Sequence, residues 1–202
     1  MNSSNFLANP GNPFFADASV IINLNATYCA AAIIGAFPNE FVVTSNVRRE
    51  LALGAINGHE CGQKLEKLIR DGLVGALPLE SIDELNYRSL IEGESRHTLD
   101  DGEAATIACA VAHNGVALID DRKAKTIGAS RFPNLNFAST VDLLIHELVR
   151  ERIGASAQND AVFLALRDAR MNVPGHTLRE VVELIGRERA AECRSLPRSV
   201  RS

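Results

Sequence analysis

The chain has 202 residues, of which 46% are hydrophobic and 23% charged, as in an ordinary globular protein that can bury one full core and a modest appendage. No apolar run is long enough to cross a bilayer, and residues 1–13 lack the basic and apolar segments of a secretory signal, so we expect a cytoplasmic protein with no membrane partner. The net charge of −4 is uneven, because residues 150–202 carry ten Arg against seven acids.

Along the chain, residues 1–13 are rich in Asn, Ser and Pro, which predicts a disordered N-terminal tail. Apolar runs then alternate with helical patterns up to residue 150, which is typical of an α/β domain with a mostly parallel sheet. Residues 151–193 predict a helical extension, followed by an Arg-containing tail at 194–202. The predicted strands are Phe14–Asp17, Phe41–Thr44, Leu73–Leu77, Val116–Ile119 and Leu135–Ala138.

Acidic residues occur where apolar strands end or helices begin. They are Asp17, Glu50, the Asp100-Asp101-Gly102-Glu103 group and the Asp120-Asp121 pair. Because parallel strands bring their carboxyl ends to one edge of a sheet, carboxylates that are distant in sequence can meet there. Crowded carboxylates need a cation to neutralise them, and Mg²⁺ and Mn²⁺ take carboxylate oxygen. The pattern therefore predicts a divalent metal site.

Each of these acids also has a structural interpretation. Asp17 and the Asp120-Asp121 pair fit helix N-caps, and Asp100-x-x-Glu103 fits a capping box. Capping gives no reason, however, for the acids to follow one another with a particular family's spacing. Other catalytic chemistry finds little support, since the His residues lack metal-ligand spacing, no Cys-x-x-Cys pair occurs, and the Gly-x-Ser-x-Gly and phosphate-loop motifs are absent.

Four segments resemble the PIN domain, a family of metal-dependent ribonucleases that includes many bacterial toxins. The four segments follow one another in the expected order. The third segment looks like the Gly-Glu-Ala form of one PIN branch. The segments begin at Phe14-Phe15-Ala16-Asp17, Val42-Val43-Thr44-Ser45, Leu99-Asp100-Asp101-Gly102-Glu103 and Val116-Ala117-Leu118-Ile119-Asp120-Asp121.

The resemblance implies a three-layer α/β/α fold with about five strands and a Mg²⁺- or Mn²⁺-dependent endoribonuclease. Asp17 and Asp121, with Asp120 close behind, would bind metal directly. Glu50 and Glu103 would reach the metal or its water. Many PIN proteins have an Asp where this chain has Ala104 or Ala105, so we favour Glu103 as the third acid and keep Asp101 as its substitute.

Supporting residues follow from the same resemblance. Ser19 and either Thr44 or Ser45 would orient a carboxylate or a water molecule. Arg122 and Lys123 would contact the substrate phosphate.

The expected partners are RNA, a small antitoxin and a second copy of the chain, with Tyr28, Ile33 and Ile34 as an apolar dimer surface. Two alternatives stay open. One is a PIN-like module that has lost catalysis and only binds RNA or protein, and the other is a receiver-like Mg²⁺-binding phosphorylation switch.

Overall fold

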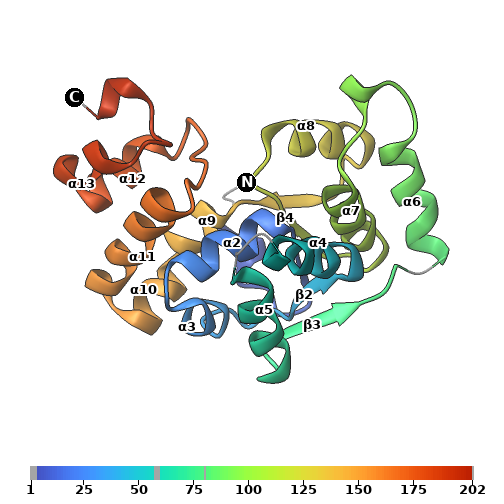
Figure 1. The fold of residues 1–202 in the computed structure, drawn as a ribbon, viewed down its shortest axis with the longest axis horizontal. Helices are drawn as coiled ribbons and strands as arrows, with labels where there is room; N and C mark the ends of the chain where they lie inside the picture. The colour runs from blue at the N-terminus through green and yellow to red at the C-terminus, as the bar shows by residue number, and fades with distance from the viewer. Residues whose placement is uncertain (1–3, 57–59, 80, 202) are drawn as a thin grey trace. The chain divides into compact units, whose positions relative to one another are not determined.

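The computed structural model describes residues 4–56, 60–79 and 81–201 and divides into two compact units (Figure 1). The first unit consists of Met1–Ile21 and Pro38–Ala138, and the second of Ile22–Phe37 and Ser139–Ser202. The sequence predicted one boundary near residue 150. It could not show that a segment from early in the chain belongs with the C-terminal helices, because that grouping depends on contacts between distant residues.

A parallel sheet forms the centre of the first unit. Within the described part of the chain it has five strands in the order β3-β2-β1-β4-β5, and each neighbouring pair is parallel. Each strand lies within one residue of its predicted bounds at both ends, so the predicted α/β class is confirmed. The strands are β1 (Phe14–Ala16), β2 (Phe41–Thr44), β3 (Val74–Leu77), β4 (Val116–Leu118) and β5 (Asn136–Ala138).

The chain changes direction across this sheet at β1. It first moves outward through β2 to β3, and then returns to place β4 and β5 on the other side of β1. Right-handed crossovers in opposite directions put helices on both faces, which gives the predicted three-layer α/β/α arrangement. In such sheets ligands bind beyond the carboxyl ends of the strands where the direction reverses. That point lies between β1 and β4.

The helices of the first unit include one that is buried nearly all round. α7 packs against β1, β2 and β4 and also against α4 and α6. Its Ala104, Ala105, Ile107 and Ala108 are fully buried, which explains why the segment is uniformly apolar. The helical elements of this unit are α1 (Ser4–Leu7), α4 (Ser45–Ile56), α5 (Cys61–Arg70), α6 (Ser81–Ile91), η1 (Ser95–His97), α7 (Asp101–Ala112) and α8 (Arg122–Arg131).

Residues 4–13 of the predicted N-terminal tail are described, and residues 1–3 lie outside the described residues. Residues 4–7 form α1, and Leu7 is buried. The side chain of Asn39 donates hydrogen bonds to the carbonyl oxygens of Asn9 at 2.6 Å and Asn12 at 2.9 Å. This mostly polar segment is thus held by one buried apolar side chain and by one side-chain amide that donates to its backbone.

The second unit is helical. α2 (Ala18–Ala26) begins in the first unit and ends in the second, and the remaining elements are α3 (Ala30–Ile34), α9 (Thr140–Leu144), α10 (Glu147–Ile153), α11 (Ala155–Asp168), α12 (Leu178–Ile185), α13 (Arg187–Glu192) and η2 (Arg198–Val200). Arg189 joins α13 to α11 by donating to Asn159 at 2.7 Å and Asp160 at 2.6 Å. Leu196 is buried, so a residue of the Arg-containing tail at 194–202 also packs into the interior.

The apolar surface that we expected for a dimer is not available as predicted. Ile33 is fully buried and Ile34 is 3% exposed, so both belong to the interior of the chain. Tyr28 alone of the three is exposed, at 75%, and it stands at a left-handed backbone position with a φ of 58°.

Candidate active site

Two of the predicted acidic positions meet where the sheet changes direction. Asp17 follows β1, and Asp120 and Asp121 follow β4, which is its neighbour in the sheet. The backbone N–H of Asp17 donates to the carbonyl oxygen of Leu118 at 3.1 Å, which fixes the two strand ends together. The topology therefore places these acids at the edge where parallel sheets bind ligands.

Asp17 is a buried carboxylate, with 6% of its surface exposed. One of its oxygens accepts hydrogen bonds from the hydroxyl of Ser19 at 2.8 Å and from the Ser19 N–H at 3.3 Å. Burial raises the pKa of Asp17, these hydrogen bonds oppose that rise, and the charge of Asp120 adds to it. Ser19 therefore contacts Asp17 directly and holds its orientation, while most of the carboxylate's solvation has been lost.

Glu50 reaches the same place from α4. A methyl group added at Gly102, in the first turn of α7, would lie 2.7 Å from Oε2 of Glu50 and 3.4 Å from Oδ1 of Asp17. Gly102 thus leaves room for two carboxylates that come from different elements. Partial burial raises the pKa of Glu50, and the charges of Asp17, Asp100 and Asp101 raise it further.

The carboxyl of Glu103 has a strongly raised pKa. Partial burial, followed by the charges of Asp17 and Asp121, raises its pKa to about 7. Oε2 of Glu103 also accepts the N–H of Asp100 at 3.4 Å, as the predicted capping box requires. The residue therefore has both of the properties that the sequence suggested, a capping contact and a place among the other acids.

The pair after β4 is divided between interior and surface. Asp120 is 7% exposed, whereas Asp121 is exposed and is the N-cap of α8, accepting the N–H of Ala124 at 2.8 Å. Arg122 and Lys123 follow in the first turn of α8, and both are exposed. The ammonium group of Lys123 donates to the carbonyl oxygen of Ser95 at 3.0 Å, so this side chain supports the η1 segment.

The two hydroxyl residues after β2 differ in their surroundings. Thr44 is 1% exposed, and its Oγ1 accepts the N–H of Val47 at 3.3 Å, as at a helix N-terminus. Ser45 is exposed and donates to the side-chain oxygen of Asn46 at 3.4 Å. The Ser19 hydroxyl, in contrast, donates directly to one of the converging acids, Asp17.

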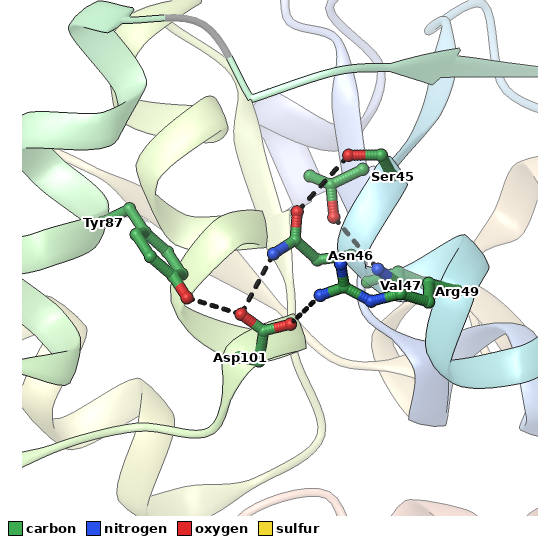
Figure 2. A network of polar contacts seen from close by, with 7 residues as sticks. Ser45, Asn46, Val47, Arg49, Tyr87 and Asp101 are labelled. Atoms are coloured by element: carbon green, nitrogen blue, oxygen red, sulfur yellow. Dashed lines mark hydrogen bonds and ion pairs between the residues drawn. The ribbon is translucent and has the colours of Figure 1, made fainter. Parts of the chain in front are cut away.

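Asp101 lies beside the converging acids and has its own set of partners (Figure 2). It accepts hydrogen bonds from Asn46, Tyr87 and Arg49. Partial burial works to raise the pKa of Asp101, but the three donors outweigh it and the pKa is lowered. The sequence analysis missed Asn46, Arg49 and Tyr87. The spacing of Asn46, Arg49 and Glu50 on one helix face was a signal for the first two.

A comparison with protein families shows which family the chain belongs to. A family model described as a PIN domain matches residues 14–187. The chain belongs to the PIN domain family. Searches of curated proteins and of solved structures gave no match. PIN domains are in general nucleases, so the predicted family and a nuclease-type function are supported. The match also extends through most of the segment that the sequence analysis treated as a separate helical extension.

PIN domains typically use divalent metals, so the acids of this chain can be tested for fit. In residues 4–56, 60–79 and 81–201, no group of three or more Asp, Glu, His or Cys side chains is close enough together to hold an ion. The donor chemistry nevertheless fits Mg²⁺ or Mn²⁺, because Asp17, Glu50 and Glu103 offer only oxygen. Burial is the main reason that the pKa values of these three carboxyls are raised, and the charges of neighbouring acids raise them further; a divalent cation would relieve that repulsion.

Among the helices in the described ranges of this PIN domain protein, none is long and apolar enough to span a bilayer.

Proposed function

We propose that this PIN domain protein is a Mg²⁺- or Mn²⁺-dependent endoribonuclease that hydrolyses phosphodiester bonds in RNA. The observation that carries the proposal is the meeting of acids from separate elements at the point where the sheet changes direction. Asp17 and Glu50 share the space above Gly102, and partial burial, together with the charges of Asp17 and Asp121, raises the pKa of Glu103 to about 7. Helix capping alone does not require such crowding.

Asp17, Glu103 and Asp121 are the proposed metal ligands, with Asp120 as a further donor. A bound divalent cation would activate a water molecule and neutralise charge on the phosphate. Ser19 would keep Asp17 oriented through its 2.8 Å hydrogen bond. Glu50 would act from α4 on the water side of the pocket, since it is more exposed than Asp17.

Arg122 is the proposed contact for the substrate phosphate. It is exposed and directly follows Asp121, so its guanidinium can meet a phosphate that approaches the acids. Lys123 would contact the phosphate as well only if its ammonium group gave up the 3.0 Å hydrogen bond to the carbonyl oxygen of Ser95. Thr44 and Ser45 would act on the site indirectly, through the start of α4 that carries Glu50.

Glu103 is the better candidate for the third acid. Ala104 and Ala105, where many PIN proteins have an Asp, are fully buried in the core. Asp101 has both oxygens engaged by donors from the protein, whereas Glu103 has only the long contact to the N–H of Asp100. A carboxyl with few partners and a raised pKa is the one that gains most from a cation.

The toxin role, a small antitoxin that covers the acidic pocket, a homodimer and a cytoplasmic location belong to this proposal as its biological setting. An antitoxin would need a basic side chain to enter a pocket with so many carboxylates. With Ile33 and Ile34 buried, a dimer surface would have to be formed elsewhere.

A cleavage assay with labelled single-stranded RNA tests the proposal. We expect activity with Mg²⁺ or Mn²⁺ and none in EDTA. Glu103→Gln should lower the rate by about two orders of magnitude or more, since Gln fills the same capping position but is not a charged ligand. If Glu103→Gln cleaves like wild type, Glu103 only caps α7. If wild type binds RNA without cleaving it in any metal, the inactive binding module is the correct function.

A further inference from the structure

The carboxylate of Asp101 joins three helices at one point (Figure 2). Its Oδ1 accepts from the Asn46 amide at 3.0 Å and from the Tyr87 hydroxyl at 2.5 Å. Its Oδ2 accepts from the Arg49 guanidinium at 2.7 Å. Asn46 and Arg49 belong to α4, Tyr87 to α6, and Asp101 itself begins α7. Both oxygens are therefore occupied by donors from two other helices.

This junction lies directly beside the acidic pocket. Arg49 precedes Glu50, and Asp101 precedes Gly102. At Gly102 the two helices approach closely, because an added methyl group would lie 2.7 Å from Glu50 Oε2 and 3.6 Å from Val47 Cγ2. The hydrogen bonds to Asp101 thus hold α4 against α7 within one residue of the place where Glu50 meets Asp17.

Acidic side chains lie close together where these two helices meet. The first turn of α7 carries Asp101 and Glu103, and Glu50 of α4 lies beside that turn, with its Oε2 2.7 Å from the Cβ position of Gly102. Repulsion between like charges favours a separation of α4 from the start of α7. Arg49 places a positive charge on α4 next to Asp101 on α7, and it therefore opposes that separation.

We propose that Asp101 is a positioning residue that fastens α4 and α6 to α7, so that Glu50 stays beside Gly102 and Asp17 in the arrangement that receives a divalent cation. It does not bind the cation itself. This inference rests on the proposed function and assigns Asn46, Arg49 and Tyr87 a shared part in it. The simpler interpretation is an exposed ion pair of little consequence, since the Arg49 and Asp101 side chains are 66% and 47% exposed.

Binding of Mn²⁺ alone, measured by calorimetric titration without RNA, separates these interpretations. Replacing a residue that orients metal ligands typically weakens metal binding by about 10–100-fold. Asp101→Asn should therefore weaken Mn²⁺ binding by about 10-fold without changing the stoichiometry. Arg49→Gln and Tyr87→Phe should each weaken it less. The Asp101→Asn, Arg49→Gln double variant should be no weaker than Asp101→Asn, because both changes break the same contact.

Arg48→Gln is the matched control. Arg48 is the neighbouring residue on α4 and pairs with Glu66 through two hydrogen bonds, at 2.5 and 2.8 Å, so that it ties α4 to α5 instead of α7. We expect Arg48→Gln to leave Mn²⁺ affinity within about 2-fold of wild type. Melting temperatures of all variants, measured without metal, show whether each still folds, and Tyr87→Phe is the mildest change.

Three results would overturn the inference. A complete loss of a Mn²⁺ equivalent in Asp101→Asn, as expected for Asp17→Asn, would make Asp101 a ligand. Affinity equal to wild type in Asp101→Asn would leave only a surface ion pair. Equal losses in Arg48→Gln and Arg49→Gln would mean that any contact of α4 matters. A wild type that binds no Mn²⁺ would overturn the proposed function as well, whereas the first three results leave it standing.

Discussion

Glu103→Gln should stabilise the metal-free protein above neutral pH. The pKa of Glu103 is raised to about 7 from an ordinary value of 4.5. Because the folded state holds this proton more tightly than the unfolded state, wild-type stability is lost as the pH rises from about 4.5 to about 7. Gln carries no charge and keeps the capping contact. The variant should therefore not lose stability as the pH rises.

The size of the effect follows from the same shift. One pKa unit corresponds to about 1.4 kcal/mol, but Glu103 is only partly buried and solvent screens its charge. We therefore expect a gain of about 1–2 kcal/mol at about pH 8 and almost none at about pH 5. For a chain of this size, that gain corresponds to a rise in melting temperature of roughly 2–8 °C.

Thermal unfolding in EDTA across this pH range measures the difference. Glu180→Gln is a suitable control, because Glu180 has the same position in the first turn of α12 and lies outside the acidic group. Its melting curve should stay parallel to that of wild type. A Glu103→Gln protein that also stays parallel to wild type from about pH 5 to about pH 8 would refute the reasoning, because Glu103 would then ionise without strain.

Three further predictions concern the same pocket. Gly102→Ala should lower both the melting temperature and the Mn²⁺ affinity, because the new methyl group would lie 2.7 Å from Glu50 Oε2. The control Gly54→Ala on α4 meets nothing within 4 Å and should be neutral or stabilising, so equal melting temperatures of the two variants would contradict this prediction. Mg²⁺ at about ten times its Kd should raise the free energy of unfolding of wild type by about 1.4 kcal/mol. Asp121→Asn keeps the N-cap, and Mg²⁺ should raise its free energy of unfolding much less. An equal rise in both proteins would mean that Asp121 is not a metal ligand. Mn²⁺ affinity should rise from about pH 6 to about pH 8 in wild type and stay flat in Glu103→Gln, and parallel titrations would show that Glu103 releases no proton on binding.

The sheet could be predicted from the sequence for reasons that are local. Apolar runs such as Phe41–Thr44 end at polar residues, and the bounds of the strands follow from that change. The convergence of Asp17 with Asp121 then follows from parallel topology, in which adjacent strands deliver their ends to one edge.

What the sequence could not predict depends on contacts between distant residues. Asp101 is 14 residues from Tyr87 and 52 from Arg49, so nothing local marks it as a junction. Leu7 is buried although it belongs to a segment rich in Asn, Ser and Pro. Lys123 looked like a free cation beside the acids, but it supports the carbonyl oxygen of Ser95, 28 residues earlier. Each of these cases is decided by packing that local sequence patterns do not encode.

The most direct test of the central claim is the rate of RNA cleavage when Mn²⁺ is added back to EDTA-treated protein, measured for Asp17→Asn and for wild type. Asn keeps the shape of the side chain at the end of β1 and removes the charge that a cation requires. We predict that wild type regains activity with added Mn²⁺ while Asp17→Asn, folded to the same extent, stays at background. Equal activity of the two proteins, or full activity of wild type in EDTA, would contradict the account.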